Sequence, residues 1–315
     1  MIEKKRAIAL GFFDGVHIGH SALLRRALAA AGESGVVPSV ITFDTHPAGF
    51  VTGRSVPLIN SPEDRAGLIQ RLFGIDDIIF LHFDYETASM RWDKFVEHLA
   101  DEFGARRLIA GHDFKFGHRG EGDAGRLREK CREIGLDCDI IPEVKLDGVT
   151  SSSTYIRGLI AGGEISRANE FLGHPHVLTD FVRYGYRLGR VIGTPTVNMC
   201  FADGVLVPAH GVYATRVTLG GGDAHVGVTN IGTRPTVSDS DRVTAETHIL
   251  DYQGNLYGKT VRVEFFERLR EEQQFSGVEE LKERIAQDCA RAAKYFEDIR
   301  SRRSGRRADI ITPGS

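Results

Sequence analysis

The sequence of 315 residues has no apolar run that approaches the roughly 18 residues of a membrane-spanning helix. Near its start only four apolar residues in a row, 7–10, precede the segment GFFDG, whereas the core of a secretory signal needs at least about seven. These absences argue against a membrane protein and against a secreted one. We therefore expect a cytoplasmic protein that makes no membrane contact.

Cysteine is also scarce. The four cysteines, at 131, 138, 200 and 289, form no C-x-x-C pair, so the sequence supports neither a zinc knuckle nor a dithiol redox motif. We expect free thiols that fill core space in a reducing compartment. The net charge of −3 gives no positive excess for a polyanion, so we expect no nucleic acid partner. Arginines after residue 301 lie among serine and glycine, which is typical of a solvated, mobile tail.

The length allows about two domains with separate cores. In the first half, short apolar segments alternate with amphipathic ones, which predicts a parallel sheet with helices on both faces. The strands are expected at 7–10, 36–43, 76–83, 106–111 and 136–142. The helices are expected at 21–32, which would end on Gly32, and at 61–74, 91–104 and 125–135. Ligands of such a sheet bind beyond the carboxyl ends of its strands.

After about residue 175 the pattern changes to short β-rich segments. Strands are expected at 177–185, 211–219, 224–232, 243–251 and 259–267. Evenly spaced short strands suggest a small closed barrel. A helix over 278–296 follows them, and the domain boundary should lie within about 160–182.

The segment GFFDGVHIGH (11–20) lies between the first strand and the first helix, with His17 and His20 separated by two residues. Amides at a helix start are unpaired and carry partial positive charge, which suits an anion, phosphate above all. Two imidazoles there could stabilise charge that develops on phosphorus in a transition state. The alternative is a pair of surface histidines in a turn. We assign four other residues of this segment to nucleotide and phosphate binding: Gly11, Asp14, Gly15 and Gly19.

Two further polar clusters follow expected strands. The first is GHDFKFGHRGEGD (111–123), and the second is TSSSTYIR (150–157). In the second, Ser152, Ser153 and Thr154 would cap a helix that carries Arg157. A hydroxyl-rich helix start with an arginine one turn later suits a triphosphate. Taken alone, each cluster could also be a polar surface loop or a plain helix cap.

The second half contains a glycine-rich segment, YGYRLGRVIGTPTVN (184–198). Its glycines at 185, 189 and 193 would let the backbone approach phosphates. The hydroxyl of Thr196 and the amide oxygen of Asn198 can both reach a hard cation such as Mg²⁺. An ordinary glycine-rich connection between strands is the alternative.

Glu246 is a candidate general base. Alternation along the strand 243–251 puts Glu246 and His248 on one face, and Thr247 and Ile249 on the other. A primary alcohol is a poor nucleophile, so a kinase that acts on one gains from a carboxylate within hydrogen-bond reach. The alternative is a solvent-facing glutamate.

Taken together, the three clusters of the first half resemble the nucleotidyltransferase superfamily, with its HxGH and SSTxIR signatures. The whole chain, from about residue 7 to 290, resembles the prokaryotic bifunctional riboflavin kinase/FMN adenylyltransferases, also called FAD synthetases. The motifs occur in the family's order: GFFDGVHIGH, TFDTHP, GHDFKFG, SSTYIR, GTPTVN, NIGTRPT, ETHILD, LYGK and RLREEQQF. The resemblance is specific because its two signature sets belong to different folds.

This resemblance implies the fold and the two reactions. A Rossmann-like α/β nucleotidyltransferase domain would adenylylate FMN with ATP to give FAD and pyrophosphate. A small antiparallel β-barrel domain with a C-terminal helix would first phosphorylate riboflavin with Mg-ATP. We expect the adenylyltransferase domain at 1–165, a helical linker at 166–181, the kinase domain at 182–300 and the mobile tail at 301–315. The expected ligands are riboflavin, FMN, FAD and ATP with Mg²⁺, and homo-oligomer formation stays open.

The resemblance also implies roles for single residues. His17, His20 and Arg157 would act in adenylyl transfer, and Asp113 would lie next to the flavin. The phosphate grip would consist of Ser152, Ser153 and Thr154. In the kinase half, Glu246 would be the catalytic base, Thr196 and Asn198 would bind Mg²⁺, and Gly185, Gly189 and Gly193 would lie in the nucleotide loop.

Three positions depart from the family pattern. Thr45 replaces the usual proline of F-D-P-H-P, Thr194 replaces a bulky apolar residue, and Val197 replaces an alanine. These changes leave the catalytic groups in place, and we expect them to affect substrate affinity more than activity. Three alternatives remain: an enzyme with only one of the two activities, a non-catalytic flavin-binding protein, or a fragment of a class I aminoacyl-tRNA synthetase. The last shares HIGH, but the sequence has no KMSKS-like loop.

Overall fold

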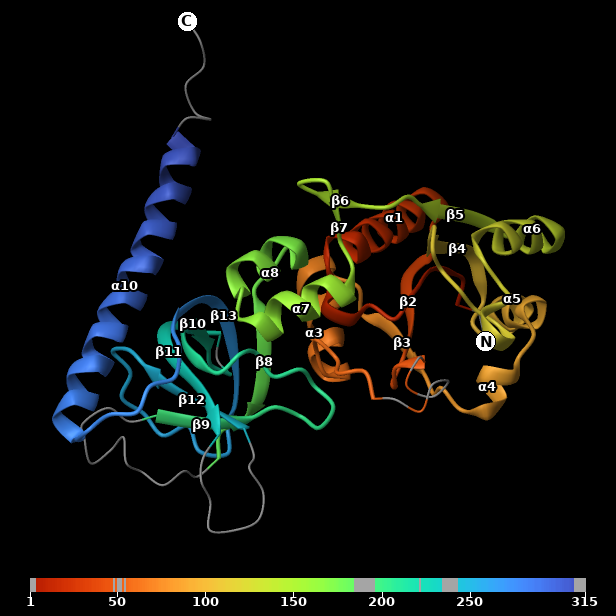
Figure 1. The fold of residues 1–315 in the computed structure, drawn as a ribbon. Helices are drawn as coiled ribbons and strands as arrows, with labels where there is room; N and C mark the ends of the chain where they lie inside the picture. The colour runs from red at the N-terminus through yellow and green to blue at the C-terminus, as the bar shows by residue number, and fades with distance from the viewer. Residues whose placement is uncertain are drawn as a thin grey trace, which may run out of the picture. The chain divides into compact units, whose positions relative to one another are not determined.

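The computed structural model describes residues 4–47, 49, 53, 55–183, 196–220, 222–233 and 243–308. The chain divides into two compact units. The first comprises Met1–Ile156 and Phe171–Gly173, and the second comprises Arg157–Glu170 and His174–Ser315. Each unit has its own sheet, and its elements can be followed by label in Figure 1.

The first unit contains a five-stranded sheet in which every strand pair is parallel. In spatial order the strands are β3 (Asp77–Leu81), β2 (Val37–Phe43), β1 (Arg6–Leu10), β4 (Ala105–Gly111) and β5 (Asp137–Ile141). The chain builds outward from β1 to β3 and then returns to the other side of β1 for β4. Strand order therefore reverses between β1 and β4, and ligands of open parallel sheets bind at the carboxyl ends beside such a reversal.

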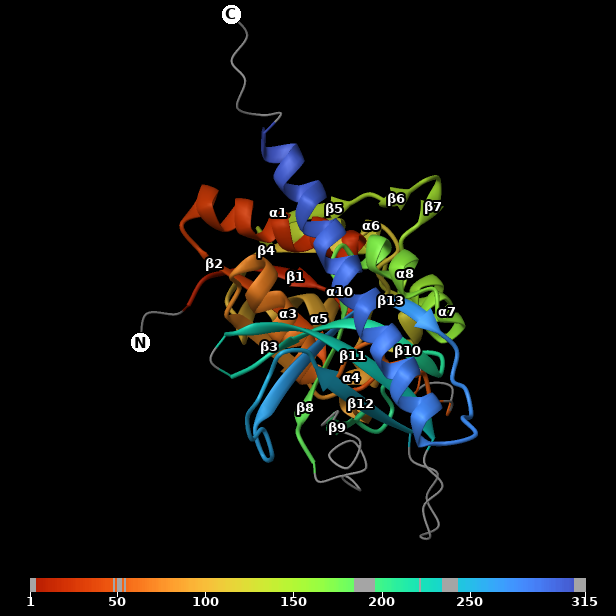
Figure 2. The same cartoon turned by 90° about the vertical axis from the view of Figure 1, so that its left-hand side faces the viewer.

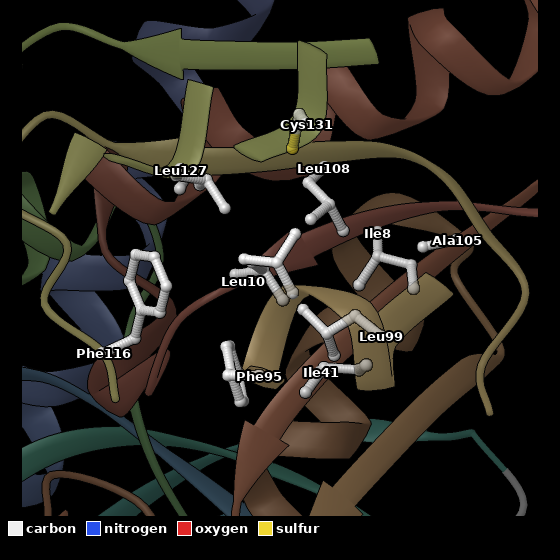
Figure 3. Close-up of a cluster of buried hydrophobic side chains, with 12 residues drawn as sticks. Ile8, Leu10, Ile41, Phe95, Leu99, Ala105, Leu108, Phe116, Leu127 and Cys131 are labelled. Atoms are coloured by element: carbon white, nitrogen blue, oxygen red, sulfur yellow. The ribbon is translucent and has the colours of Figure 1, made fainter. Parts of the chain in front are cut away.

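Helices connect these strands. Their bounds are α1 (Ile18–Ser34), α3 (Pro62–Phe73), α4 (Tyr85–Ser89), α5 (Trp92–Asp101) and α6 (Ala124–Ile134), with short 3-10 turns η1 (Asp14–Val16) and η2 (His118–Gly120). Leu99 of α5 and Leu127 of α6 belong to the buried cluster that includes Ile8 of β1 (Figure 3). Alternation turns Ala7 and Ala9 toward the other face, where α1 packs. The predicted parallel sheet with helices on both faces is confirmed.

The first helix is longer than predicted. It does not end on Gly32, which lies inside α1. It ends at Gly35, whose φ of 63° is left-handed and whose amide donates to the carbonyl of Ala31. A helix commonly ends where a glycine adopts this conformation, and an earlier glycine alone does not end it.

The second unit contains a six-stranded sheet in which every pair is antiparallel. In spatial order the strands are β8 (His176–Phe181), β13 (Thr260–Arg270), β10 (Gly211–Thr218), β11 (Ala224–Thr233), β12 (Val243–Ile249) and β9 (Thr196–Cys200). The two edges meet because the Arg183 amide donates to the Asn198 carbonyl at 2.8 Å. The Cys200 amide also donates to Asp180 Oδ2 at 2.9 Å. The predicted small antiparallel barrel is confirmed as this curled sheet.

Within the described residues, a hairpin and two helices come between the two sheets. Two two-residue strands, β6 (Lys145–Leu146) and β7 (Val149–Thr150), form the hairpin, and α7 (Ser153–Gly162) and α8 (Ile165–Leu172) follow it. The Asn169 side chain of α8 donates to the Phe265 carbonyl and accepts from the His176 amide, both at 2.8 Å. These bonds fix α8 to β13 and to the start of β8.

Helix α10 (Val278–Ala308) covers the outer face of the barrel sheet (Figure 2). Its Ala292 and Phe296 form a buried cluster with Val212 and Val228 of the sheet. The helix was predicted to end near residue 296 and continues to Ala308. Within the part of the chain that the structure describes, no helix combines the length and the apolar character needed to cross a membrane.

His176 is fully buried at the start of β8, and neither ring nitrogen has a hydrogen-bond partner among the described residues. Burial, aided by the nearby His174, lowers the pKa of His176 to about 3. An unfolded histidine titrates near pH ~6.5. Below that pH the unfolded chain therefore binds more protons than the folded one, and stability is lost as the pH falls from ~6.5 toward the folded pKa.

We predict that His176 lowers the free energy of unfolding of the wild type by up to about 1.4 kcal/mol per pH unit in this window. His176→Phe should remove that contribution. Urea denaturation at about pH 7 and about pH 5 measures the difference. His225→Phe, at a partly exposed position of β11, is the matched control. An equal loss of stability in wild type and His176→Phe would contradict the assignment.

Candidate active sites

The first candidate site begins in the turn after β1. Asp14 is 1% exposed, and its Oδ1 accepts hydrogen bonds from the backbone amides of Ile59 at 2.8 Å and Asn60 at 3.3 Å. Gly15 has a φ of 80°, and a Cβ there would lie 2.9 Å from Ile59 Cδ1. The turn is thus held against the segment that precedes α3. The carboxylate of Asp14 faces the backbone, so its direct effect is on the shape of the turn.

The two histidines lie together at the start of α1. His17 is the N-cap of the helix, and its Nδ1 accepts from the His20 amide at 3.4 Å. The two rings stack, with centroids 3.6 Å apart and an interplanar angle of 22°. Because Nδ1 of His17 accepts a hydrogen bond, the proton of its neutral ring lies on Nε2. His17 is therefore a hydrogen-bond donor through Nε2.

His20 is held neutral in the free protein. Burial lowers its pKa well below the usual value, and repulsion from His17, when that ring is protonated, and from Arg65 lowers it further. Its Nδ1 is buried without a hydrogen-bond partner among the described residues, which leaves Nε2 as the ring nitrogen for a ligand. An anion bound here would raise this pKa, because it would stabilise the protonated ring.

Gly19 allows the histidine pair to stack. A Cβ on Gly19 would lie 2.9 Å from Cε1 and 3.0 Å from Nδ1 of His17. Real Cβ atoms essentially never come within 3.0 Å of another group, so any side chain at Gly19 would displace the His17 ring. The glycine of HxGH is therefore required because a side chain has no room there. Backbone conformation is not the reason, since the φ of Gly19 lies outside the left-handed region.

The start of α7 completes this site within the first unit. The Ser151 hydroxyl lies 3.3 Å from His17 Nδ1. The Ser152 hydroxyl accepts from the Tyr155 amide at 3.3 Å, as predicted for a helix cap. The Ser153 hydroxyl donates to the Asp14 carbonyl at 2.9 Å. These contacts bring the SSTYIR segment to the HIGH turn, and Ser151 is a member that the sequence analysis missed.

The other predicted residues of the first half are placed as follows. Thr154 is exposed near the start of α7. Arg157 lies on the same helix and is half-buried, but it belongs to the second unit. Asp113 is exposed just after β4, the strand that pairs with β1. Thr45, which departs from the family pattern, donates to Asp44 Oδ1 at 3.2 Å.

The second candidate site is a pocket of about 210 Å³ between the barrel sheet and α10. It brings together Thr196 and Glu246, both singled out from the sequence. The sequence analysis named His248 only as the neighbour of Glu246 on the same strand face, and it too lines the pocket. The remaining lining residues were missed: Val212, Val228, Asn230, Arg270, Glu272, Gln273, Phe275, Leu281, Ile285 and Asp288.

Cross-strand register explains the polar wall of this pocket. Glu246 on β12 is paired with Asn198 on β9 and with Asn230 on β11. Paired residues of an antiparallel sheet point to the same face, so the carboxylate lies between two amides. Thr247, the next residue, points to the opposite face and is fully buried. The predicted alternation is therefore present, and knowledge of the register would have revealed Asn230.

One end of the pocket carries a buried ion pair. Nε of Arg270 lies 2.9 Å from Oδ2 of Asp288, which is 1% exposed. The Arg270 guanidinium also lies 5.6 Å from the ring centroid of Phe275. Asp288 comes from α10 and Arg270 from β13, so only the folded chain brings them together. The predicted nucleotide-loop residues Gly185, Gly189 and Gly193 lie outside the described residues.

The fold and these sites define a class of protein: a two-domain transferase, with paired histidines at a helix start in an α/β unit and a carboxylate in the pocket of a small barrel. Family models agree with this class. The FAD synthetase model matches residues 1–155, and the riboflavin kinase model matches residues 172–296.

Curated relatives cover nearly the whole chain. Proteins named bifunctional riboflavin kinase/FMN adenylyltransferase are 31% identical in Bacillus subtilis, over 95% of both chains, and 36% identical in Pseudomonas fluorescens, over 90% of both. The Escherichia coli protein of that name is 34% identical over 92% of both chains. The chain belongs to the bifunctional riboflavin kinase/FMN adenylyltransferase family. The predicted family and enzyme class are confirmed.

A solved structure shares the fold. It is described as a macrolide-efflux protein from Streptococcus pneumoniae and matches with a TM-score of 0.79. It is 28% identical over 90% of this chain and 92% of its own.

Proposed function

We propose that the second unit phosphorylates riboflavin to FMN and that the first unit adenylylates FMN to FAD, each with ATP. One observation carries this proposal: each unit holds the groups that its own reaction needs. The first has the stacked pair His17–His20 at the start of α1, and the second has Glu246 beside Thr196 in the pocket under α10.

In the first unit, a phosphate oxygen of FMN attacks the α-phosphorus of ATP. A new P–O bond forms, and the bond to the pyrophosphate leaving group breaks. The nucleophile is already anionic and needs no general base, so positioning and charge stabilisation supply the catalysis. His17 donates through Nε2, His20 faces the same phosphates through Nε2, and the first amides of α1 add partial positive charge.

The triphosphate is held at two helix starts. Gly11, Gly15 and Gly19 are proposed to line the nucleotide, and Asp14 keeps their turn in shape. The grip on the other side consists of Ser152, Ser153, Thr154 and Arg157. Ser152 caps α7 and Ser153 holds the Asp14 carbonyl, so Thr154 and the first amides of α7 are the groups positioned for phosphate oxygens. Asp113, exposed beyond β4, is assigned to the flavin.

In the second unit, Glu246 takes the proton of the terminal ribityl hydroxyl of riboflavin while that oxygen attacks the γ-phosphorus of ATP. ADP leaves, and FMN remains. The apolar residues of the pocket, which include Val212, Leu281 and Ile285, suit the flavin ring system. Asn198 and Asn230, the cross-strand partners of Glu246, flank its carboxylate.

The side chains of Thr196 and Asn198 fit the Mg²⁺ that accompanies ATP. They stand two apart on β9 and therefore share a face, and Asn198 is 9% exposed. Mg²⁺ takes oxygen ligands and keeps several positions for phosphate and water, so two protein oxygens suffice. When bound, the ion would neutralise phosphate charge. Gly185, Gly189 and Gly193 are proposed to belong to the nucleotide loop.

Two substitutions should separate the two activities. With FMN supplied, His20→Ala should lower FAD formation by about 10²-fold or more, because a phosphate ligand is lost. With riboflavin supplied, the same variant should form FMN at the wild-type rate. Chromatography of the flavins formed over time measures both rates.

Glu246→Gln should give the opposite pattern. FMN formation from riboflavin should fall by about 10²–10⁴-fold, because the amide cannot accept the hydroxyl proton. FAD formation from added FMN should be unchanged. Equal damage to both reactions by either substitution, in a folded protein, would show that the two sites are wrongly assigned.

Gly19→Ala tests the space argument for HxGH. Alanine is up to about 1 kcal/mol better than glycine inside a helix, which offsets the cost of moving the His17 cap, so the variant should fold. FAD formation should nevertheless fall about tenfold or more, because the His17 ring must move. Gly32→Ala on the same helix is the matched control, since a Cβ there meets nothing within 4 Å. Similar FAD formation by the two variants would refute the argument.

A further inference from the structure

Arg65 of α3 is a buried cation. Its side chain is fully buried, and no carboxylate among the described residues lies within ion-pair distance of its guanidinium. Nε and Nη2 are buried and have no hydrogen-bond partner among the described residues. A neutral side chain of similar length would fill the same space without burying a charge. The presence of a charged guanidinium at this buried position therefore needs another explanation.

The hydrogen bonds of Arg65 join the carboxyl ends of two strands. Nη1 donates to the carbonyls of Phe12 at 2.9 Å and Phe43 at 2.8 Å, and to Thr42 Oγ1 at 2.9 Å. Thr42 Oγ1 itself donates to the Phe12 carbonyl at 2.8 Å. Phe12 follows β1 and leads into the turn that carries His17. Through Nη1 alone, Arg65 thus ties the residue that leads into the histidine turn to the end of β2.

The positive charge of Arg65 lies beneath the same turn. Its guanidinium carbon is 4.3 Å from the ring centroid of Phe12 and 5.8 Å from that of Phe80, so two aromatic faces replace a carboxylate partner. Charge left without a paired anion projects a positive potential to its surroundings. The turn leads directly to the start of α1, where the polyphosphate is predicted to bind.

We propose that Arg65 is a positioning residue of the adenylyl-transfer site, which fixes the Phe12 carbonyl ahead of the two histidines and supplies positive potential for the bound phosphates. The inference rests on the proposed function of the first unit and adds Arg65 to its machinery. Arg65 acts through the turn and through its field, without touching the reacting atoms.

Neighbouring charges bear on this electrostatic role. Burial lowers the pKa of Arg65 to about 10, while the charges of Asp14, Glu63 and Asp44 favour its protonated form, so it stays charged at neutral pH. The groups that lower the pKa of His20 are the burial of its own ring, His17 and Arg65. Removal of the Arg65 charge should therefore raise the pKa of His20.

The test compares Arg65→Met, which removes both the hydrogen bonds of the guanidinium and its charge, with Arg65→Lys, which keeps the charge. For Arg65→Met we expect kcat/KM of FAD formation to fall about tenfold or more. We also expect the His20 ring to titrate at higher pH by nuclear magnetic resonance. Arg65→Lys should keep the wild-type titration of His20 but have a lower kcat, because the shorter lysine side chain does not place its ammonium where Nη1 binds the two carbonyls and the Thr42 hydroxyl. Arg71→Met, at an exposed position of α3, is the control.

Two results would overturn the inference. One is a folded Arg65→Met whose FAD formation and His20 titration match the wild type. The other, should Arg65→Met fail to fold, is an Arg65→Lys whose kcat and KM for ATP and FMN are those of the wild type, because Arg65 would then only stabilise the fold. Riboflavin phosphorylation reports on the second unit in every variant. Failure of the proposed function would look different: the wild type would form no FAD, while the His20 titrations could still be compared.

Discussion

The buried carboxylate of Asp14 is the contact on which the first site depends. Its Oδ1 accepts hydrogen bonds from the amides of Ile59 and Asn60, and the backbone carbonyl of Asp14 accepts one from the hydroxyl of Ser153. Segments far apart in the sequence thereby meet at the reversal of strand order between β1 and β4. A buried carboxylate with backbone donors is costly to disturb, since any residue that cannot accept leaves those amides unsatisfied. These hydrogen bonds hold the turn that carries the stacked histidines.

The second site follows from the period of a β-strand. On β12, Thr247 turns inward, where its hydroxyl is 2.8 Å from that of Thr229, which in turn is 2.9 Å from that of Thr215. This buried chain of hydroxyls fixes which face of β12 is the interior. Glu246 must then face outward, toward the pocket that α10 closes. The register of β12 thus determines both that the threonine hydroxyls are buried and that Glu246 faces the pocket.

Local signals explain how far the sequence alone could lead. Helix α3 was predictable from its ends. Ser61 caps its start, Pro62 is its first residue, and Gly74 ends it in the left-handed conformation. The histidine turn was predictable because its motif stands between a strand and a helix. Helix α1 was predicted to end too early, because the sequence does not tell which glycine has positive φ. Strand β9 was read as part of a glycine-rich loop, since only its pairing with β12 makes it a strand. Arg65, Asn230 and the Arg270–Asp288 pair were missed, because long-range packing alone gives them partners.

The central claim is that one chain contains two distinct active sites that act in sequence. The most direct measurement is chromatography of the flavins formed when the purified wild type is incubated with riboflavin and Mg-ATP, without added FMN. The account predicts that FMN appears first and that FAD then forms at its expense. A folded protein that forms neither FMN nor FAD would contradict the account, and FMN that is never converted would refute the assignment of the histidine turn.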